Sequence, residues 1–271
     1  MYDTIVIGAG PAGMTAALYA ARANLKVATL EQGAPGGQMN NTSDIENYPG
    51  FESISGPELS MKMFEPLEKL GVENLYGIVS GIEDRGNYKV VKTGDEEYQT
   101  KTVIIATGAK HRHIGVAVEE GIYLTRFANS VTIVHRRDEL RAQKVLQARA
   151  FANEKVKFIW DSVVEEIKGD DIKVRSVDIK NVKTGEVTNH EFGGVFVYVG
   201  LDPVSDYLTG LDITDQNGWV ITDDKMATSV PGIFAIGDVR QKDLRQITTA
   251  VGEGAIAGIE AYNYVTALGD K

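Results

Sequence analysis

The chain contains no cysteine among its 271 residues. Without a thiol it can form no disulfide and no thiolate metal site, and it cannot itself attack a disulfide. Basic residues are also in deficit, with 28 Lys and Arg against 38 Asp and Glu and a net charge of −10. This balance argues against general binding to nucleic acid or to an anionic membrane. Partners of those two classes are therefore not expected.

Long apolar runs and histidines are scarce as well. No apolar run approaches the length of a membrane span, and Met1 leads within a few residues into an apolar strand, so we expect no signal peptide and a cytoplasmic protein. Of four histidines, only His111 and His113 are close in sequence. Lys110 and Arg112 beside them supply positive charge rather than ligands. The sequence therefore predicts a solvated linker there and no metal site.

What the sequence does have, near its N-terminus, is a strand that leads into a glycine-rich turn and a helix. Residues 5–7 are β-branched and suit a buried parallel strand, and Gly8, Gly10 and Gly13 form a G-x-G-x-x-G pattern. The first glycine permits a tight turn, the second lets a pyrophosphate approach the backbone, and the third lets the helix pack on the strand. The alanine-rich segment 11–23 predicts the helix whose N-terminus faces the phosphates.

An acidic residue follows at a suitable distance. A second predicted strand, over residues 26–30, ends in Glu31, eighteen residues beyond Gly13. A carboxylate near this position accepts hydrogen bonds from the ribose of an adenosine. Together the turn, the helix and the acid predict dinucleotide binding. The alternative is a glycine-rich turn that serves packing alone.

The rest of the chain alternates between helical and extended patterns, which indicates an α/β protein. The loop over residues 33–40 has too many glycines for regular structure. The predicted helices cover residues 56–70, 117–129, 142–153 and 246–265. The predicted strands cover residues 76–81, 88–93, 97–100, 101–106, 131–135, 157–160, 163–168, 174–181, 194–200 and 232–239.

These landmarks together resemble the bacterial thioredoxin reductases, which are FAD- and NADPH-dependent pyridine nucleotide-disulfide oxidoreductases. The matching segments occur in the expected order and cover nearly the whole chain: GAGPAGMTA at 8–16, PGGQ at 35–38, ENYPG at 46–50, ATG at 106–108, VTIVHRRDELR at 131–141, GIFAIGD at 232–238 and RQI at 245–247. The resemblance implies two Rossmann-like dinucleotide-binding domains. The FAD domain would be discontinuous, in residues 1–112 and 202–271, and the inserted, truncated NADPH domain would occupy residues 113–201.

The same resemblance implies a set of FAD-binding residues. Glu31 is expected at the adenosine ribose and Asp238 at the ribityl chain, although a turn or helix cap is the alternative for Asp238. The residues near 245 are expected to close over the flavin. The full set is Gly8, Gly10, Pro11, Ala12, Gly13, Glu31, Gln32, Gly37, Gln38, Asn47, Val79, Thr107, Gly108, Gly237, Asp238, Arg245, Gln246 and Ile247.

A basic run in the second domain indicates the other dinucleotide. His135, Arg136, Arg137 and Arg141 stand where the first domain has Glu31. Cationic, preferably forked donors suit a ribose 2′-phosphate, whereas a free hydroxyl would want a carboxylate, so the run favours NADPH over NADH. An ordinary solvated charge run is the alternative.

The chain departs from the family pattern at one junction. In the family, the linker leads into the redox C-x-x-C, the first NADPH-domain strand and its phosphate turn, whereas here Val116 runs directly into Ala117. The missing strand would be central in a sheet of order 3-2-1-4-5, so its removal leaves two strand edges without a partner. We hypothesise a deletion relative to a parent reductase. A Cα separation between Val116 and Ala117 well above about 3.8 Å would instead indicate a chain break.

The implied function depends on which segments of the family pattern this chain has and which it lacks. The parent enzyme would be a homodimer that passes electrons from NADPH through FAD and an enzyme dithiol to thioredoxin. Without the dithiol we assign no catalytic residue, and without the phosphate turn we expect weakened NADPH binding. The chain should then retain FAD and show at best slow NADPH oxidase or diaphorase activity. The alternatives are an enzyme like the cysteine-free ferredoxin–NADP reductases and a non-catalytic FAD-binding module.

Overall fold

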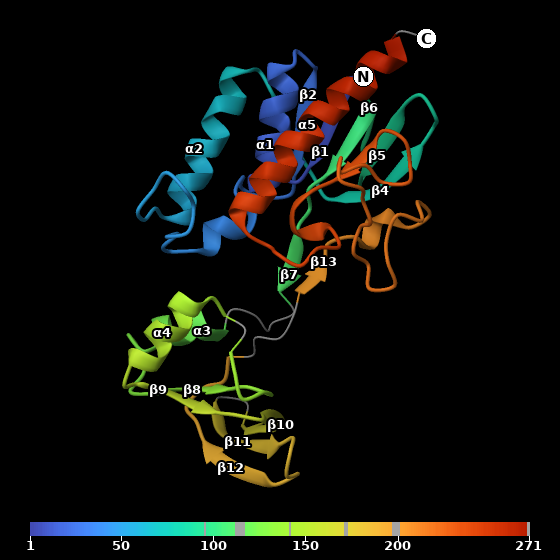
Figure 1. Cartoon of the computed structure of the whole chain (residues 1–271). Coiled ribbons are helices and arrows are strands. Elements are labelled where there is room, and N and C mark those ends of the chain that lie inside the picture. The colour runs from blue at the N-terminus through green and yellow to red at the C-terminus, as the bar shows by residue number, and fades with distance from the viewer. Residues whose placement is uncertain (95, 112–116, 141, 171–172, 197–200, 270–271) are drawn as a thin grey trace. The chain divides into compact units, whose positions relative to one another are not determined.

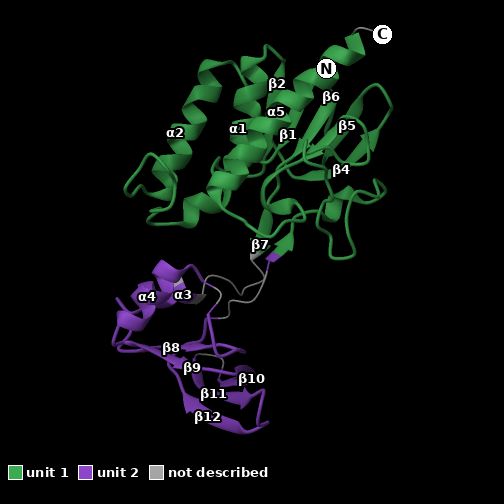
Figure 2. Cartoon of the chain, in the orientation of Figure 1, with its two compact units in different colours: residues 1–110, 202–271 green, residues 111–201 purple. Residues whose placement is uncertain are grey.

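The computed structural model describes residues 1–94, 96–111, 117–140, 142–170, 173–196 and 201–269 (Figure 1). The chain forms two compact units (Figure 2). Unit 1 contains residues 1–110 and 202–271, and unit 2 contains residues 111–201.

Unit 1 is built on a mixed sheet whose parallel part lies in the order β3-β2-β1-β6-β14. In chain order these strands are β1 (Tyr2–Ile7), β2 (Val27–Glu31), β3 (Glu73–Tyr76), β6 (Glu96–Ile105) and β14 (Ile233–Ala235). The antiparallel strands β4 (Val79–Asp84) and β5 (Lys89–Thr93) extend the sheet beside the N-terminal half of β6. Counted along the chain, the parallel strands have the order 3-2-1-4-5 that is typical of a dinucleotide-binding fold.

The middle strands are apolar because they are covered on both faces. Val6 and Ile104 point to one face, where they pack with α1 (Pro11–Arg22), α2 (Gly56–Lys69) and α5 (Ile247–Gly269). The neighbouring Ile5, Ile7, Val103 and Ile105 point to the other face, against β4, β5 and the segment that contains Leu208 and Val220.

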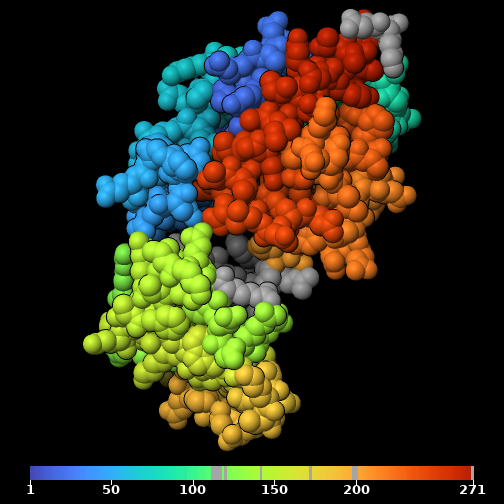
Figure 3. Space-filling model, viewed as in Figure 1, coloured from blue at the N-terminus to red at the C-terminus, as the bar shows by residue number. Residues whose placement is uncertain are grey.

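Small residues let α1 and α5 approach each other closely. A Cβ atom on Gly254 would lie 2.4 Å from the carbonyl oxygen of Ala12, and one on Gly258 would lie 2.7 Å from that of Ala16. Helix α5 (red) crosses the face of the molecule shown in Figure 3, between the N-terminal residues and the segment that precedes it. The short 3₁₀ segments are η1 (Gly37–Asn41), η2 (Asp206–Leu208) and η3 (Gly237–Val239).

In its described residues, unit 2 combines two helices with two small sheets. Its helices are α3 (Ala117–Leu124) and α4 (Lys144–Ala152), and its strands are β8 (Val131–Val134), β9 (Val156–Ile159), β10 (Ser162–Gly169), β11 (Val174–Asn181) and β12 (Val187–Glu191). Strands β10–β12 are antiparallel, whereas β8 pairs in parallel with β9 and with no other strand of the described residues. Strands β7 (Ala109–His111) and β13 (Leu201–Pro203) pair where the chain leaves unit 1 and returns to it.

The α/β class predicted from the sequence is confirmed, and most predicted elements are present, but several boundaries were wrong. The strand predicted over 76–81 is the end of β3 and the start of β4, which lie at opposite ends of the strand order, β3 beside β2 and β4 beside β5. The two strands predicted between 97 and 106 form the single strand β6, and the loop over 33–40 contains the start of η1. Strand β12 was not predicted.

Two further predictions concern residues beyond the described part of the chain. Residues 194–196 of the strand predicted over 194–200 form no strand, and its remainder lies outside the described residues. The Cα separation between Val116 and Ala117, which would test the junction, also involves a residue outside the described part, because Val116 is not described. None of the described helices is long and apolar enough to cross a membrane.

Candidate functional site

The glycine turn after β1 has two glycines that packing requires and one that it does not. Gly8 has a φ of +102°, and a Cβ atom there would lie 2.4 Å from the carbonyl oxygen of Ala106. A Cβ atom on Gly13 would lie 1.9 Å from the carbonyl oxygen of Gly8. In contrast, a Cβ atom on Gly10 would meet no atom within 4 Å, so the space in front of Gly10 is open.

The N-terminus of α1 opens onto the same place. Its N-cap, Gly10, provides no side-chain hydrogen bond, Pro11 follows at the first helical position, and the first turn carries no acidic residue. The first N–H groups of a helix have no acceptor within the helix, and the helix dipole favours an anion there. This end of α1, which includes Ala12 and Gly13, can therefore bind a phosphate group through the backbone.

Glu31 lies at the end of β2 and is tied to the glycine turn. One carboxylate oxygen, Oε2, accepts a hydrogen bond from the backbone N–H of Ala9 at 2.8 Å. The other, Oε1, accepts from Gln32 at 2.8 Å and from Gly33 at 3.1 Å. A carboxylate has about four lone-pair sites, so these bonds orient Glu31 and still leave room for a hydroxyl donor.

The loop that follows β2 folds back onto the turn. The N–H of Gly36 donates to the carbonyl oxygen of Ala9 at 2.8 Å. A Cβ atom on the next residue, Gly37, would lie 3.5 Å from the Cα atom of Gly10, so bare backbone borders the open space from both sides. Gln38 also lies in η1, at its exposed surface. The loop and the turn thus form a cradle of glycine backbone.

Several other residues of the predicted FAD set lie just beyond the ends of parallel strands. Thr107 and Gly108 follow β6, and Thr107 donates from Oγ1 to the carbonyl oxygen of Val204 at 2.6 Å. Val79 opens β4 shortly after β3 ends, opposite Thr93. Because the carboxyl ends of parallel strands meet at one edge of a sheet, these segments and the glycine turn share that edge, where doubly wound proteins bind their ligands.

The turn after β14 reaches the same edge. Gly237 has a φ of +73°, and a Cβ atom there would lie 3.0 Å from the Cβ atom of Ala12. Asp238 follows it in η3. Gln246 precedes α5, which begins at Ile247, and the side-chain amide of Asn47 donates to Oε1 of Gln246 at 3.0 Å. Segments 199 residues apart in the sequence are thereby brought together.

Arg245 uses its guanidinium to hold this turn. It donates from Nε to the carbonyl oxygen of Asp238 at 3.2 Å, from Nη1 to that of Lys242 at 2.9 Å and from Nη2 to that of Arg240 at 3.0 Å. It also stacks on Trp219, with 3.9 Å between the guanidinium carbon and the ring centroid. Burial lowers the pKa of Arg245, against the opposing effect of nearby carboxylates, but an arginine remains charged at neutral pH.

In unit 2 the predicted NADPH residues follow β8. The Nδ1 atom of His135 accepts a hydrogen bond from the backbone N–H of Arg137 at 3.3 Å. Arg136 and Arg137 are exposed, and Arg141 lies outside the described residues. An exposed pair of guanidinium groups at the carboxyl end of a parallel strand can receive an anionic ligand.

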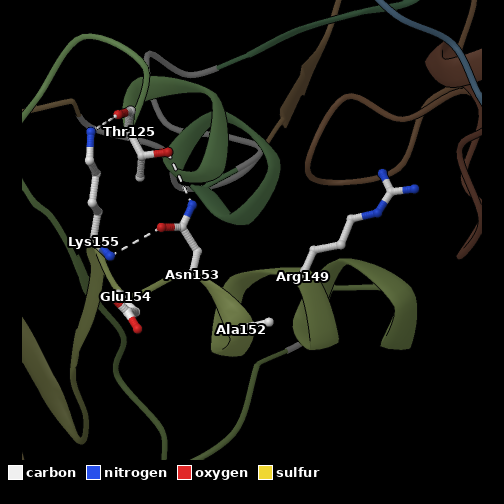
Figure 4. A pocket seen from close by; sticks show the side chains of 6 residues that line it. All are labelled: Thr125, Arg149, Ala152, Asn153, Glu154 and Lys155. Carbon is white, nitrogen blue, oxygen red and sulfur yellow. Dashed lines mark hydrogen bonds between the residues drawn. The ribbon is translucent and has the colours of Figure 1, made fainter.

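An open hollow in unit 2 is lined by none of the predicted site residues (Figure 4). It has a volume of about 630 Å³ and is bordered by Thr125, Arg149, Ala152, Asn153, Glu154 and Lys155. Asn153 donates to Oγ1 of Thr125 at 3.1 Å, and Lys155 donates to the carbonyl oxygen of Thr125 at 2.8 Å. These contacts tie the end of α3 to the segment between α4 and β9. The described residues contain no group of three or more His, Asp or Glu side chains that could hold a metal ion.

The sequence reasoning missed one cluster of charged residues beside Asp238. Glu253, Arg240 and Lys242 form ion pairs there, and their side chains are almost buried. The available signal was the position of Glu253 between Gly252 and Gly254 on a helix that is otherwise small and apolar at this point. A charged residue on such a face needs partners.

Comparisons with known proteins agree with this architecture. The sequence profile described as "Pyridine nucleotide-disulphide oxidoreductase" matches residues 2–117 and 114–254. The thioredoxin reductase of Bacillus subtilis (strain 168) is 50% identical, over 99% of this chain and 96% of its own. The crystal structure of Lactococcus lactis thioredoxin reductase in the FR conformation has a TM-score of 0.95 and 58% identity, over 98% of this chain and 100% of its own. The structure of T. acidophilum thioredoxin reductase has a TM-score of 0.88 at 30% identity, over 97% of this chain and 98% of its own.

The alignments also show that this chain lacks residues that a relative has. The alignment with the Bacillus subtilis protein runs over 303 residues, although this chain has only 271, so the relative has residues without a counterpart in this chain. The two segments matched by the family profile meet at residues 114–117, where the sequence departs from the family pattern. On these similarities the chain belongs to the pyridine nucleotide-disulphide oxidoreductase family and, within it, to the thioredoxin reductases.

Proposed function

We propose that residues 1–112 and 202–271 bind FAD at the carboxyl edge of the parallel strands. The observation that carries this proposal is the cradle formed by Gly10, Gly37 and the uncapped N-terminus of α1, with Glu31 fixed beside it. Bare backbone, free N–H groups and an oriented carboxylate are the donor and acceptor set that an adenosine diphosphate moiety requires. The residues present therefore fit the cofactor that the family uses.

In this proposal each segment has a separate task. Glu31 accepts hydrogen bonds from the adenosine ribose, and the first turn of α1 donates to the pyrophosphate. Asp238 accepts from the ribityl chain. Asn47 and Gln246, which already bond to each other, restrict the approach to the flavin. Bound FAD would supply the exchange between hydride donors and electron acceptors.

We assign the residual NADPH domain to residues 113–201. His135, Arg136, Arg137 and Arg141 would receive the ribose 2′-phosphate, which the exposure of Arg136 and Arg137 supports. The phosphate turn that the family pattern has before this segment is absent from the sequence, and β8 has β9 as its single partner among the described strands. NADPH binding should therefore be weak.

The chain has the family's fold without the family's dithiol. Its relatives are named thioredoxin reductases, and transfer from an enzyme to a protein disulfide requires a thiolate nucleophile. This chain has no cysteine, so it cannot complete that transfer. We propose that it binds FAD and that its activity is limited to slow oxidation of NADPH, with thioredoxin as the partner of the parent enzyme only.

We also propose that the protein is a homodimer in the cytoplasm. Helix α5 exposes Ile256, Ile259 and Tyr262, with exposed fractions of 41%, 41% and 39%. Their spacing of three residues places them on one face of the helix, which suits contact with a second copy. Sedimentation of the purified chain tests this, since a single species of monomer mass across concentrations would contradict it.

The full chain, purified and mixed anaerobically with NADPH, tests the function. We expect a flavin absorbance spectrum in the isolated or FAD-incubated protein, followed by slow bleaching. A folded protein that stays colourless with excess FAD would contradict the proposal. A flavoprotein that NADPH does not bleach would be an inert FAD-binding module instead. Rapid electron transfer to a one-electron acceptor would favour a reductase of the ferredoxin–NADP type.

A further inference from the structure

The turn that carries Asp238 is held by a nearly buried carboxylate on α5. Oε2 of Glu253 accepts a hydrogen bond from the backbone N–H of Gly237 at 2.6 Å. Oε1 of the same side chain lies 2.9 Å from Nη1 of Arg240 and 3.1 Å from Nζ of Lys242. Both carboxylate oxygens of Glu253 are thus engaged, one with the backbone of the turn and one with the two cations.

These charges are removed from water. The exposed fractions of the side chains are 13% for Glu253, 12% for Arg240 and 11% for Lys242. Charges at this depth persist only when each has a partner, because the cost of desolvation is large. Arg240 has a second partner, since its Nε donates to Oγ1 of Thr222 at 2.6 Å. The cluster is therefore fixed in position rather than fluctuating at the surface.

Lys242 lies between two carboxylates. Its Nζ atom is 3.1 Å from Oε1 of Glu253 and 3.9 Å from Oδ1 of Asp238. The shorter contact is the stronger one, so Glu253 takes most of the attraction of the ammonium group. Asp238 is the more exposed of the two acids, with 37% of its side chain accessible. Its carboxylate can therefore still accept a hydrogen bond from a ligand.

The backbone places this cluster at the proposed FAD site. Gly237 packs against Ala12 in the first turn of α1, and Gly254, the neighbour of Glu253, packs against the carbonyl oxygen of the same Ala12. A shift of the turn at Gly237 would consequently move Asp238 relative to the cradle.

From this geometry we infer that Glu253 is a positioning residue for the flavin cofactor, an inference that rests on the proposed FAD site. It holds the Gly237–Asp238 turn through the N–H of Gly237 and keeps Lys242 from pairing fully with Asp238. When Glu253 loses its charge, Asp238 remains as the ion-pair partner of Lys242 among the described residues. The stronger pairing with Lys242 then competes with the hydroxyl groups of the ligand.

The test uses the full chain, freed of flavin and titrated with FAD, with quenching of the flavin fluorescence as the readout. Glu253→Gln keeps the volume of the side chain and removes its charge. We expect it to weaken FAD binding by about tenfold to a hundredfold, the range for losing a hydrogen bond to a charged group. Glu260→Gln is the matched control, because Glu260 lies on the same helix and has long contacts, 3.6 Å to Lys225 and 3.4 Å to Asn263. Its affinity for FAD should equal that of the unmodified chain.

A second substitution separates positioning from general stability. The double variant Lys242→Met, Glu253→Gln removes the cation that competes for Asp238, so it should bind FAD several-fold more tightly than Glu253→Gln alone. If Glu253 merely stabilises the fold, adding Lys242→Met should weaken FAD binding further. That result would overturn the inference. Unchanged affinity of Glu253→Gln would overturn it too.

Lys242→Met alone covers the case in which Glu253→Gln does not fold. It should bind FAD about as tightly as the unmodified chain, and a loss of tenfold or more would count against the inference. A failure of the unmodified chain to bind FAD would refute the proposed function instead, so the two failures are distinguishable.

Discussion

The carbonyl oxygen of Gly8 lies only 1.9 Å from the place that a Cβ atom of Gly13 would occupy. Gly10, between them in sequence, would place a Cβ atom in open space. Glycines of one motif therefore have different roles. Gly13 lets α1 pack against β1, whereas Gly10 keeps the approach to the helix N-terminus clear.

This difference predicts opposite results for two alanine substitutions. Gly13→Ala should destabilise the protein by about 1–3 kcal/mol or more, because backbone has to move to relieve the overlap. Gly10→Ala should leave the free energy of unfolding within about 1 kcal/mol of the original, and yet weaken FAD binding at least tenfold. Denaturant unfolding and FAD titration measure the two quantities. Equal loss of stability in both variants would contradict the assignment of roles.

Glu31 provides the second prediction. Glu31→Gln replaces one acceptor oxygen by an amide NH₂ group, so the side chain can no longer accept both from Ala9 on one atom and from Gln32 and Gly33 on the other. The loss of an oriented acceptor should weaken FAD binding by about tenfold or more. Glu65→Gln is a suitable control, because Glu65 pairs on the exposed side of α2 with Lys69 at 2.7 Å. The prediction fails if the two variants bind FAD equally well.

A buried lysine in the antiparallel part of the sheet gives a prediction on stability. Lys89 is 1% exposed, and its Nζ lies 2.9 Å from Oδ1 of Asp84 and 2.8 Å from the carbonyl oxygen of Gly86. Lys89→Met should lower the free energy of unfolding by about 1–3 kcal/mol, because both acceptors lose their donor. Denaturant unfolding at neutral pH measures this loss, with Lys92→Met at a half-buried position of the same strand as a control.

The same pair makes stability depend on acid. Burial of Asp84 acts to raise its pKa, but the hydrogen bonds from Lys89 and from the N–H of Gly86 outweigh burial and the pKa is lowered. A carboxyl group whose pKa is lowered in the folded state stabilises the fold at pH values above its unfolded-state pKa of about 3.9. This stabilisation is lost as the pH falls through the folded-state pKa. On acidification from neutral pH, the free energy of unfolding of Lys89→Met should therefore fall less than that of the unmodified chain. Parallel acid dependence in both proteins would contradict the prediction.

How much of the structure could be predicted from the sequence depended on how far apart in the sequence the contacting residues are. The turn around Gly8 and the position of Glu31 follow from a local pattern of strand, glycines and helix, and the structure places them side by side. The contact of Asn47 with Gln246 joins residues 199 positions apart, which no local pattern encodes. The splitting of the segment 76–81 into β3 and β4 has a similar origin, because β3 pairs with β2 and β4 pairs with β5, and a local pattern does not encode which strand a segment pairs with.

Charged residues near the site were the hardest to interpret. The family resemblance indicated Arg245 as a residue that closes over the flavin, whereas the structure shows its guanidinium bound to three backbone carbonyl groups and stacked on Trp219. Glu253 was not singled out at all, since its importance depends on burial and on two cations that only the folded chain brings to it. Electrostatic roles of this kind depend on the tertiary environment more than on residue type.

The junction between Val116 and Ala117 gives the last prediction. Strand β8 pairs only with β9 in the described part of unit 2, and the two matched segments of the family profile meet at residues 114–117. A parallel strand with an open edge lacks partners for its backbone and invites association. Inserting at this junction a segment that follows the family pattern, with a C-x-x-C, a strand and a glycine-rich phosphate turn, should complete the sheet. NADPH should then bleach the flavin faster, and thioredoxin-dependent oxidation of NADPH should appear.

The insertion also separates structure from chemistry when it is made in two forms. A version with both inserted cysteines changed to serine should restore the strand, raise the midpoint of thermal unfolding and strengthen NADPH binding. It should not reduce thioredoxin, because it has no thiolate to attack the disulfide. Thioredoxin reduction by the serine version would show that the dithiol is dispensable. Absence of any gain in NADPH binding in both versions would show that the missing strand and phosphate turn do not explain the weakness of this domain.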